Sequence, residues 1–149
     1  MIKTVDKHQI EKKTVFYMEN GYHCAEAVAA AVLEGMGQDA AAAVAHATAF
    51  GGGVGRSFDD ACGALSGALI VIGQLYPRQG RGEPWDKAAD LGAGIRHRFI
   101  HEFGTTHCGS LRNRFGRTQP EKCTILSGQL AAVLAELLQT HRAAAADHP

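Results

Sequence analysis

The sequence predicts an all-α protein, a compact bundle of about five to six helices around a central helix rich in alanine and glycine. Apolar residues recur at helical spacing along most of the chain, alanine is abundant, and β-branched and aromatic residues nowhere alternate over the length of a strand. A length of 149 residues, of which 46% are hydrophobic, is enough to bury one core. We therefore expect one helical domain over residues 1–149, with a flexible tail over about 142–149.

Glycine, proline and capping residues set the expected ends of the helices. In chain order, the expected helical ranges are 4–20, 22–35, 39–50, 60–76, 84–103 and 110–113, followed by a last helix from 118. Pro84 stands in the first turn of its helix, where the missing amide costs nothing, and Gly104 ends that helix. Thr118 and Glu121 have capping-box spacing at the start of the last helix.

The fourth helix follows an unusual segment, residues 50–62, which contains four glycines in five residues: Gly51, Gly52, Gly53 and Gly55. So many glycines predict a backbone with unusual dihedral angles or a close approach to another group. Asp59 or Asp60 is the expected N-cap of the helix. Cys62 would then lie at the positive end of the helix dipole, which favours its thiolate.

Four cysteines are the candidate functional residues, and each is expected in or just before the first turn of a helix: Cys24, Cys62, Cys108 and Cys123. If they converge, four thiolates suit zinc or an iron–sulfur cluster. If they work as thiols, Cys62 is the expected attacking thiolate, resolved by Cys108 or Cys123. Their spacing matches neither a zinc ribbon nor a thioredoxin-like motif, so buried inert thiols remain an alternative.

Histidines are further candidate ligands or proton carriers. His23 and His107 each directly precede a cysteine, where an imidazole can stabilise a thiolate or bind a metal, although ordinary, partly exposed histidines at loop ends are the favoured interpretation. His97 and His101 have the spacing of the zinc-protease pattern HExxH, but position 98 is an arginine where that pattern requires glutamate. That interpretation is therefore rejected.

Several motifs together resemble the C-GCAxxG-C-C family of putative redox-active proteins. They are Cys62-Gly-Ala-x-x-Gly67 after the glycine loop, Tyr-x-Cys-Ala-Glu-Ala over residues 22–27, Phe-Gly-x-x-x-Cys over residues 103–108, and a cysteine opening the last helix. The resemblance covers about residues 15–138 and nominates the four cysteines as a metal, iron–sulfur or thiol–disulfide site. It also implies an accessory role beside an oxidoreductase or transporter, with a redox partner protein.

A second functional class uses the glycine loop instead of the cysteines. Gly51, Gly52, Gly53, Gly55 and Arg56 could form a nest that binds an anion or a small molecule. A phosphate loop of the Walker type is excluded, because Arg56 stands where its second glycine is needed. In this alternative the cysteines are structural. A third possibility, a purely structural partner subunit, is supported only by the close-packing helices.

Charge and hydropathy limit the partners further. The formal net charge is zero, so no overall field attracts nucleic acid. The amino-terminal residues lack the apolar core of a signal peptide, and the apolar run 61–75 is too short to cross a bilayer. We therefore expect a cytoplasmic protein without a membrane span, and the alanine-rich helix faces are compatible with a homodimer.

Overall fold

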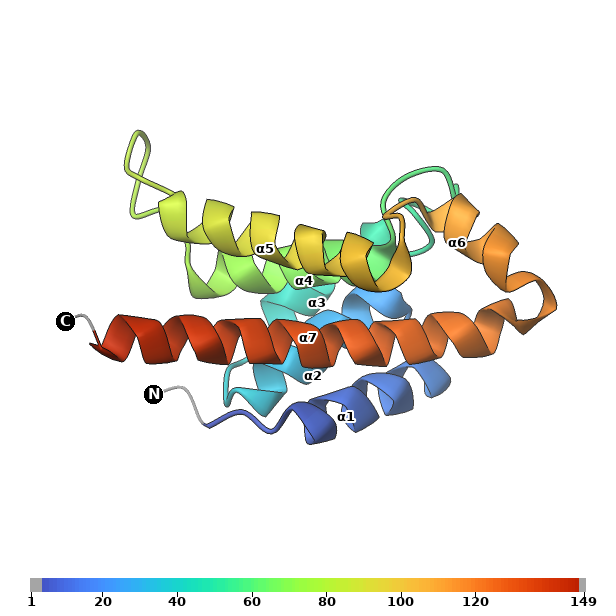
Figure 1. The fold of residues 1–149 in the computed structure, drawn as a ribbon, viewed down its shortest axis with the longest axis horizontal. Helices are drawn as coiled ribbons and strands as arrows, with labels where there is room; N and C mark the ends of the chain where they lie inside the picture. Colours follow the sequence, from blue (N-terminus) through green and yellow to red (C-terminus); the bar gives the residue numbers. More distant parts are fainter. Residues whose placement is uncertain (1–3, 148–149) are drawn as a thin grey trace.

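The computed structural model describes residues 4–147, which form helices joined by loops, with no β-strand in this range (Figure 1). The all-α prediction is confirmed. The helices are α1 (Lys7–Glu19), α2 (Cys24–Gly35), α3 (Ala41–Ala47), the 3₁₀ helix η1 (Thr48–Phe50), α4 (Gly63–Leu75), α5 (Asp86–Phe103), α6 (Cys108–Phe115), the 3₁₀ helix η2 (Gly116–Thr118) and α7 (Gln119–Asp147).

Helix α7 runs along the whole molecule, and the others pack around it (Figure 1). It contacts α1, α2, α4, α5 and α6, while α4 lies against α2, α3, α5 and α7. Helix α2 is enclosed on all sides, because every residue from 27 to 33 is buried. The core is formed by small and aliphatic side chains, with Phe99 as its largest fully buried residue.

Close packing of α2 on α4 depends on Gly67. A Cβ atom at this position would collide with the backbone carbonyl oxygen of Ala25. The two backbones therefore approach as closely as a glycine allows, which agrees with the thin fourth helix that the sequence predicts. This contact holds the first turns of α2 and α4, and the cysteines that they carry, side by side.

Two helix starts lie a few residues later than expected. Helix α1 begins at Lys7, because the Asp6 carboxylate accepts from the amides of His8 and Gln9. Helix α5 begins at Asp86, so Pro84 lies in the preceding loop; its end at Gly104, with φ of 87°, is as predicted. Each difference is local and leaves the helix itself in place.

The start of α4 is a more important correction, since Asp59 and Asp60 do not cap it. Cys62 itself is the N-cap residue, and no side chain caps the helix. The two aspartates lie in the loop, where the Asp59 side chain contacts His107 instead. The non-helical conformation of Cys62, with ψ of 132°, allows its own sulfur to face the free amides of the first turn.

The last helix also begins differently. The chain enters α7 directly from η2, so Thr118 is not an extended N-cap, and its hydroxyl donates to the Phe115 carbonyl at 2.8 Å. Helix α7 continues to Asp147, through most of the range expected to be a flexible tail. Residues 148–149, the end of that expected tail, lie outside the described residues.

By length and composition alone, the helical stretch Cys108–Ala146 could cross a membrane, although the sequence patterns did not indicate a span. A core helix of a soluble protein passes the same test, and 44% of its most apolar window is buried inside the protein. Its buried leucines, Leu126, Leu130, Leu134 and Leu138, belong to the core.

Candidate functional site

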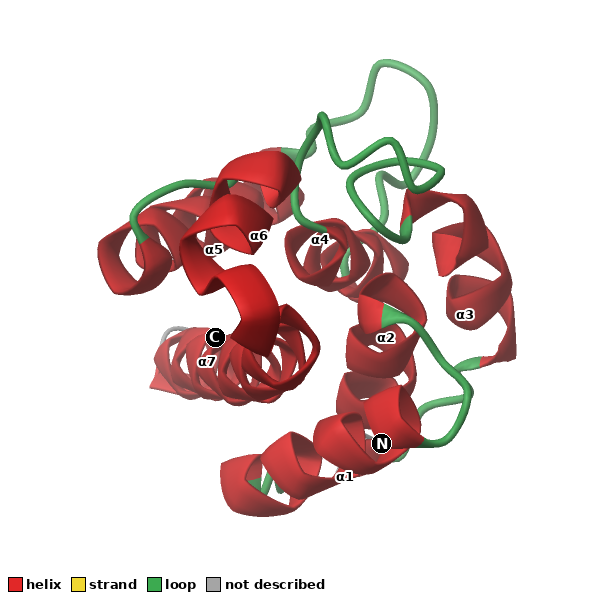
Figure 2. Cartoon of the chain, turned by 90° about the vertical axis from the view of Figure 1, so that its right-hand side faces the viewer, coloured by secondary structure: helices red, strands yellow, loops and turns green. Residues whose placement is uncertain are grey.

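All four cysteines line one cavity of about 710 Å³ at the end of the bundle where α2, α4, α6 and α7 begin. Figure 2 views the bundle from this end, with α6 in front and the loop before α4 beside it. Cys24 and Cys108 are the first residues of α2 and α6, Cys62 is the N-cap of α4, and Cys123 lies one turn into α7. The remaining wall is formed by Met18, His23, Thr48, Gly51, Gly52, Gly55, Arg56, Phe58, Gly63, Leu111, Arg112, Gln119, Leu126 and Ser127.

The glycine loop is a left-handed turn. Five consecutive residues, Gly52 to Arg56, have φ between 60° and 69°, and Phe58 also has a positive φ of 60°. Left-handed residues normally occur singly, since each non-glycine residue in this conformation costs about 1–2 kcal/mol. The glycines therefore make the turn possible, while Val54, Arg56 and Phe58 bear the strain.

Hydrogen bonds within the loop occupy most of its amides. The amides of Val54, Gly55, Arg56, Ser57 and Phe58 all donate to carbonyl oxygens of residues 49–54. These five amides are therefore not available to an external anion. Of the loop residues nominated for binding, Gly51, Gly52, Gly55 and Arg56 line the cavity, whereas Gly53 packs against Cys108.

The loop contacts the sulfur of Cys24 rather than that of Cys62. The backbone amide of Gly52 donates to the Cys24 sulfur, as does the amide of Ala25. The amides of Ala64 and Leu65, in the first turn of its own helix, act on the Cys62 sulfur instead and oppose the upward shift of its pKa.

His23 is the N-cap of α2 and forms a capping box with Glu26. Its Nε2 lies 2.7 Å from the Thr48 carbonyl oxygen and 3.3 Å from a Glu26 carboxylate oxygen. The second Glu26 oxygen accepts from the Thr48 hydroxyl at 2.9 Å. The side chain of His23 also hydrogen-bonds to Cys24. A thiol, an imidazole and a carboxylate therefore meet within one helical turn, an arrangement that suits transfer of the thiol proton to the imidazole.

This arrangement favours ionisation of Cys24 over that of the other three cysteines. Burial raises the pKa of Cys24, but hydrogen bonds from His23 and the Gly52 amide, with the charge of His23, outweigh burial and lower it overall. The pKa of His23 is raised, chiefly by its hydrogen bond to Cys24, so the two groups shift in the directions that favour proton transfer from the thiol to the imidazole.

The other three thiols are biased towards their protonated forms. Burial raises the pKa of Cys62 to about 12, and the negative charge of Cys24 adds to this effect. Burial also dominates the raised pKa values of Cys108 and Cys123, again with a contribution from Cys24. At Cys62, the expected thiolate, burial outweighs the amides of the helix start and disfavours ionisation.

A β-bridge joins the residues that precede two of the cysteines, Cys62 and Cys108. Ala61 and His107 form an isolated antiparallel bridge, beside which the Cys62 amide donates to the Thr106 carbonyl at 2.7 Å. The Cys108 amide donates to the Asp60 carbonyl at 2.9 Å. The start of α4 is thereby fixed to the start of α6.

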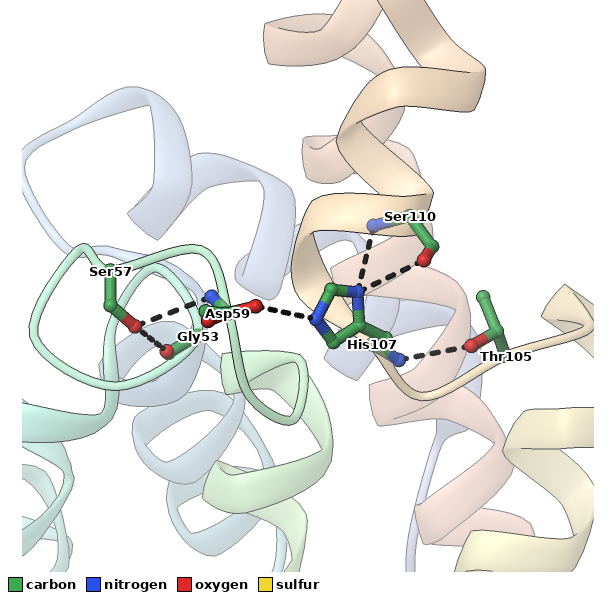
Figure 3. A network of polar contacts seen from close by, with 6 residues as sticks. All are labelled: Gly53, Ser57, Asp59, Thr105, His107 and Ser110. Atoms are coloured by element: carbon green, nitrogen blue, oxygen red, sulfur yellow. Dashed lines mark hydrogen bonds and ion pairs between the residues drawn. The ribbon is translucent and has the colours of Figure 1, made fainter.

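His107 completes this connection (Figure 3). It caps α6, since its Nδ1 accepts from the Ser110 amide at 3.1 Å, while its Nε2 lies 3.2 Å from the Asp59 carboxylate. The Ser57 hydroxyl donates to the Gly53 carbonyl at 2.6 Å inside the same loop. Thus both histidines that precede a cysteine are helix caps, and only His23 is bonded to its neighbouring thiol.

Arg112 and Gln119 are site residues that sequence reasoning missed. The Arg112 guanidinium lies 3.9 Å from the centre of the Phe58 ring, and its charge opposes the upward pKa shifts of Cys108 and Cys123. The side-chain Nε2 of Gln119 donates to the Cys123 sulfur at 3.1 Å. No local pattern reveals these contacts, whereas His23 and Glu26 have capping-box spacing that could have been recognised.

The thiols surround the cavity without converging on a point. All four cysteines are free. Within residues 4–147, no three side chains of His, Cys, Asp or Glu gather closely enough to hold one metal ion. A single tetrahedral zinc therefore does not fit the present positions of the sulfurs, since its ligands must all lie about 2.3 Å from it. His97 and His101, already rejected as ligands, lie in α5 and do not line the cavity.

Comparison with known proteins gives one match. The model of the C_GCAxxG_C_C family, described as a putative redox-active protein, matches residues 22–137. The matched range includes the four cysteines and the glycine loop. Neither a search of curated proteins nor a search of solved structures finds a match.

Proposed function

Since the chain belongs to the C_GCAxxG_C_C family of putative redox-active proteins, we propose that it carries out thiol–disulfide chemistry in the cysteine-lined cavity, with Cys24 as the attacking thiolate. The observation that carries this proposal is the difference between Cys24 and the other three cysteines. Only Cys24 has a lowered pKa, and its negative charge raises the pKa values of Cys62, Cys108 and Cys123. One thiolate among protonated thiols is the state from which a disulfide exchange begins.

Each residue has a distinct part in the proposed reaction. Cys24 attacks the disulfide of a substrate and forms a mixed disulfide, while the leaving thiolate takes a proton from the His23 imidazolium. Cys62 is the proposed resolving thiol, because Gly63, the next residue, lies directly against the Cys24 sulfur. Once Cys24 is in a disulfide its charge is lost, and one of the effects that raise the pKa of Cys62 disappears.

An iron–sulfur cluster is the second candidate, and a different observation favours it. Four cysteines from four helix starts line a single cavity, and backbone amides donate to the sulfur of Cys24. Such hydrogen bonds tune clusters held by thiolates. In this alternative, Cys24, Cys62, Cys108 and Cys123 would be the ligands, and a cluster would supply one-electron transfer. The redox partner protein and the accessory role beside an oxidoreductase or transporter are part of either proposal.

One experiment separates the candidates. The protein is purified without oxygen, and its iron, zinc, sulfide and visible absorption are measured. A metal-free sample is then treated at neutral pH with a limiting amount of iodoacetamide, and the modified cysteine is identified by peptide mass spectrometry. A second sample receives one equivalent of a small disulfide, and its disulfide linkage is mapped. The C24S and C123S variants are treated in parallel.

Thiol chemistry predicts that Cys24 is alkylated first and that the oxidised protein contains a Cys24–Cys62 bond. The C24S variant should not form it, and the C123S variant should behave like the wild type. Brown protein with iron and sulfide in stoichiometric amounts would replace the thiol mechanism with the cluster. A metal-free protein in which all four thiols resist both reagents would overturn both candidates.

A further inference from the structure

The cysteine-lined cavity carries positive charge that no carboxylate among residues 4–147 neutralises. Arg56 and Arg112 both line it, and neither forms an ion pair with any residue in this range. None of the residues that line the cavity has a carboxylate. The side chain of Asp59, in the neighbouring loop, contacts His107 instead. Two arginines without carboxylate partners beside a cavity are the chemistry that recognises carboxylates or phosphates.

Arg112 is held in position for such a role. Its guanidinium stacks on the ring of Phe58 at 3.9 Å, and the left-handed loop fixes Phe58 with a positive φ of 60°. The amide of Phe58 also bonds to the carbonyl of Gly52, the residue whose own amide reaches the Cys24 sulfur. One strained loop therefore positions the Phe58 ring on which Arg112 stacks and also provides the amide that reaches the Cys24 sulfur.

The cavity is larger and more apolar than a bare inorganic anion requires, so an organic ligand fits it better. A volume of about 710 Å³ lies in the range of cavities that hold organic ligands, and Met18, Phe58, Leu111 and Leu126 give it apolar walls. An occupant that matches the whole cavity has an apolar body, at least one anionic group for the arginines, and a reactive group that reaches Cys24.

We propose that the substrate of this cavity is a small organic disulfide that carries carboxylate or phosphate groups. This inference rests on the proposed function and names its substrate class. The anionic group binds Arg56 and Arg112, and the S–S bond lies against Cys24. Cys24 bonds to one substrate sulfur, the substrate S–S bond breaks, and the first thiolate leaves and takes a proton from His23. Cys62 then bonds to Cys24 and releases the second thiol, which takes the Cys62 proton. The protein dithiol loses two electrons, and the substrate disulfide gains them.

The test compares two aromatic disulfides: dithiobis(nitrobenzoate), which has two carboxylates, and the smaller dithiodipyridine, which is neutral. Reaction rates with reduced, metal-free protein are measured by the release of the coloured thiol. Each rate is divided by that of a small free thiol, which removes the intrinsic reactivity of the reagent. The ratio of the two normalised rates is determined for the wild type, the R56Q/R112Q double variant and the R112K variant. R117Q is the control, since Arg117 is exposed in η2 and does not line the cavity.

We expect the wild type to favour the anionic reagent by roughly tenfold or more, with the preference falling as salt is added. R56Q/R112Q should bring the ratio close to one, whereas R117Q should leave the ratio unchanged. R112K, which keeps the charge, should retain part of the preference. If R56Q/R112Q has the wild-type circular dichroism spectrum and does not change the ratio, the proposed substrate class is wrong. The thiol mechanism would not be affected by that result. If neither reagent modifies Cys24, as judged against C24S, the proposed function itself fails.

Discussion

The sulfur of Cys24 lies directly against the backbone of Gly63, so closely that no side chain could occupy position 63. The Phe50 carbonyl oxygen limits the same space, 3.0 Å from where a Cβ atom would lie. This contact explains why a glycine follows Cys62: it lets a sulfur of α2 reach the first turn of α4. The proximity of Cys24 to the Cys62–Gly63 peptide is also the geometric basis for choosing Cys62 as the resolving thiol.

A G63A substitution should therefore displace the Cys24 sulfur. We expect a loss of roughly 1–3 kcal/mol in the free energy of unfolding, as for other overpacked sites, and slower alkylation of Cys24 at neutral pH. Urea unfolding and timed alkylation measure the two effects. If Cys24 in G63A keeps its wild-type rate, the sulfur does not depend on this contact.

Removal of the His23 imidazole should move the reactivity of Cys24 to higher pH. Asparagine is a good N-cap, so an H23N variant keeps the cap of α2 while it loses the proton acceptor. Because His23 lowers the pKa of Cys24 against the effect of burial, the thiolate fraction in H23N should rise only at higher pH. At pH 7 the alkylation rate of Cys24 should therefore fall in H23N, and the two proteins should reach the same rate only above the raised pKa of Cys24 in the variant.

The pH dependence of stability is a poorer test of the same pair. Folding lowers the pKa of Cys24, so this group alone would make stability rise with pH up to its unfolded pKa. Folding raises the pKa of His23, so that group alone would make stability fall as pH increases through its folded value. The proton that Cys24 gives up is held by His23, and the two contributions largely cancel. The alkylation rate is the better test: if the rates of H23N and the wild type depend on pH in the same way, His23 does not lower the pKa of Cys24.

The left-handed turn should respond differently to alanine at two of its glycines. Gly55 has φ of 60°, and a Cβ atom added there would meet nothing within 4 Å, so G55A introduces only backbone strain, about 1 kcal/mol. Gly53 has φ of 63°, and a Cβ atom there would lie 2.5 Å from the Cβ of Cys108. G53A should therefore cost clearly more, roughly 2–4 kcal/mol, and should alter the reactivity of Cys108. Denaturant midpoints that are equal for the two variants would show that the loop does not pack on Cys108.

Two glycines of α4 should give effects of opposite sign. A Cβ atom at position 67 would collide with the Ala25 carbonyl, and because both partners are backbone, α2 and α4 would have to separate. We expect G67A to destabilise the fold by roughly 2–3 kcal/mol. At the exposed Gly73 a Cβ atom meets nothing within 4 Å, so G73A should stabilise the helix by about 0.5–1 kcal/mol. Thermal unfolding of the two variants tests the close approach of α2 and α4. If G67A is as stable as G73A, the two backbones are not in close contact at position 67.

Local patterns in the sequence were sufficient for the class of fold and for the strained loop. Helical periodicity predicted the bundle, and four clustered glycines pointed to the positive φ values that the turn adopts. The placement of Cys24, Cys62 and Cys108 at helix starts followed from the same patterns. These features depend on neighbours within one turn of the chain, which are visible in the sequence itself.

The choice of thiolate could not be predicted in this way. A helix start favours ionisation at Cys62, yet burial by distant segments raises its pKa to about 12. Cys24 benefits from the Gly52 amide, which reaches it only because the loop turns left-handed over the start of α2. Arg112 likewise enters the cavity from α6 through its contact with Phe58. Each of these effects depends on residues that are remote in the sequence, so local patterns indicated the set of cysteines but not the role of each.

The four cysteines come from four separate helix starts, and this origin has a consequence for the biosynthesis of the protein. The cavity is complete only when α7, the last of the described helices to be synthesised, has packed, so no shorter nascent chain contains it. Until then the thiols are ordinary and exposed, and four cysteines can be joined in three different pairings. An oxidant that arrives before folding could therefore join the cysteines in any of these pairings, whereas in the folded protein the proposed thiolate, Cys24, should react first. Refolding yields should accordingly depend on the order in which reductant and denaturant are removed.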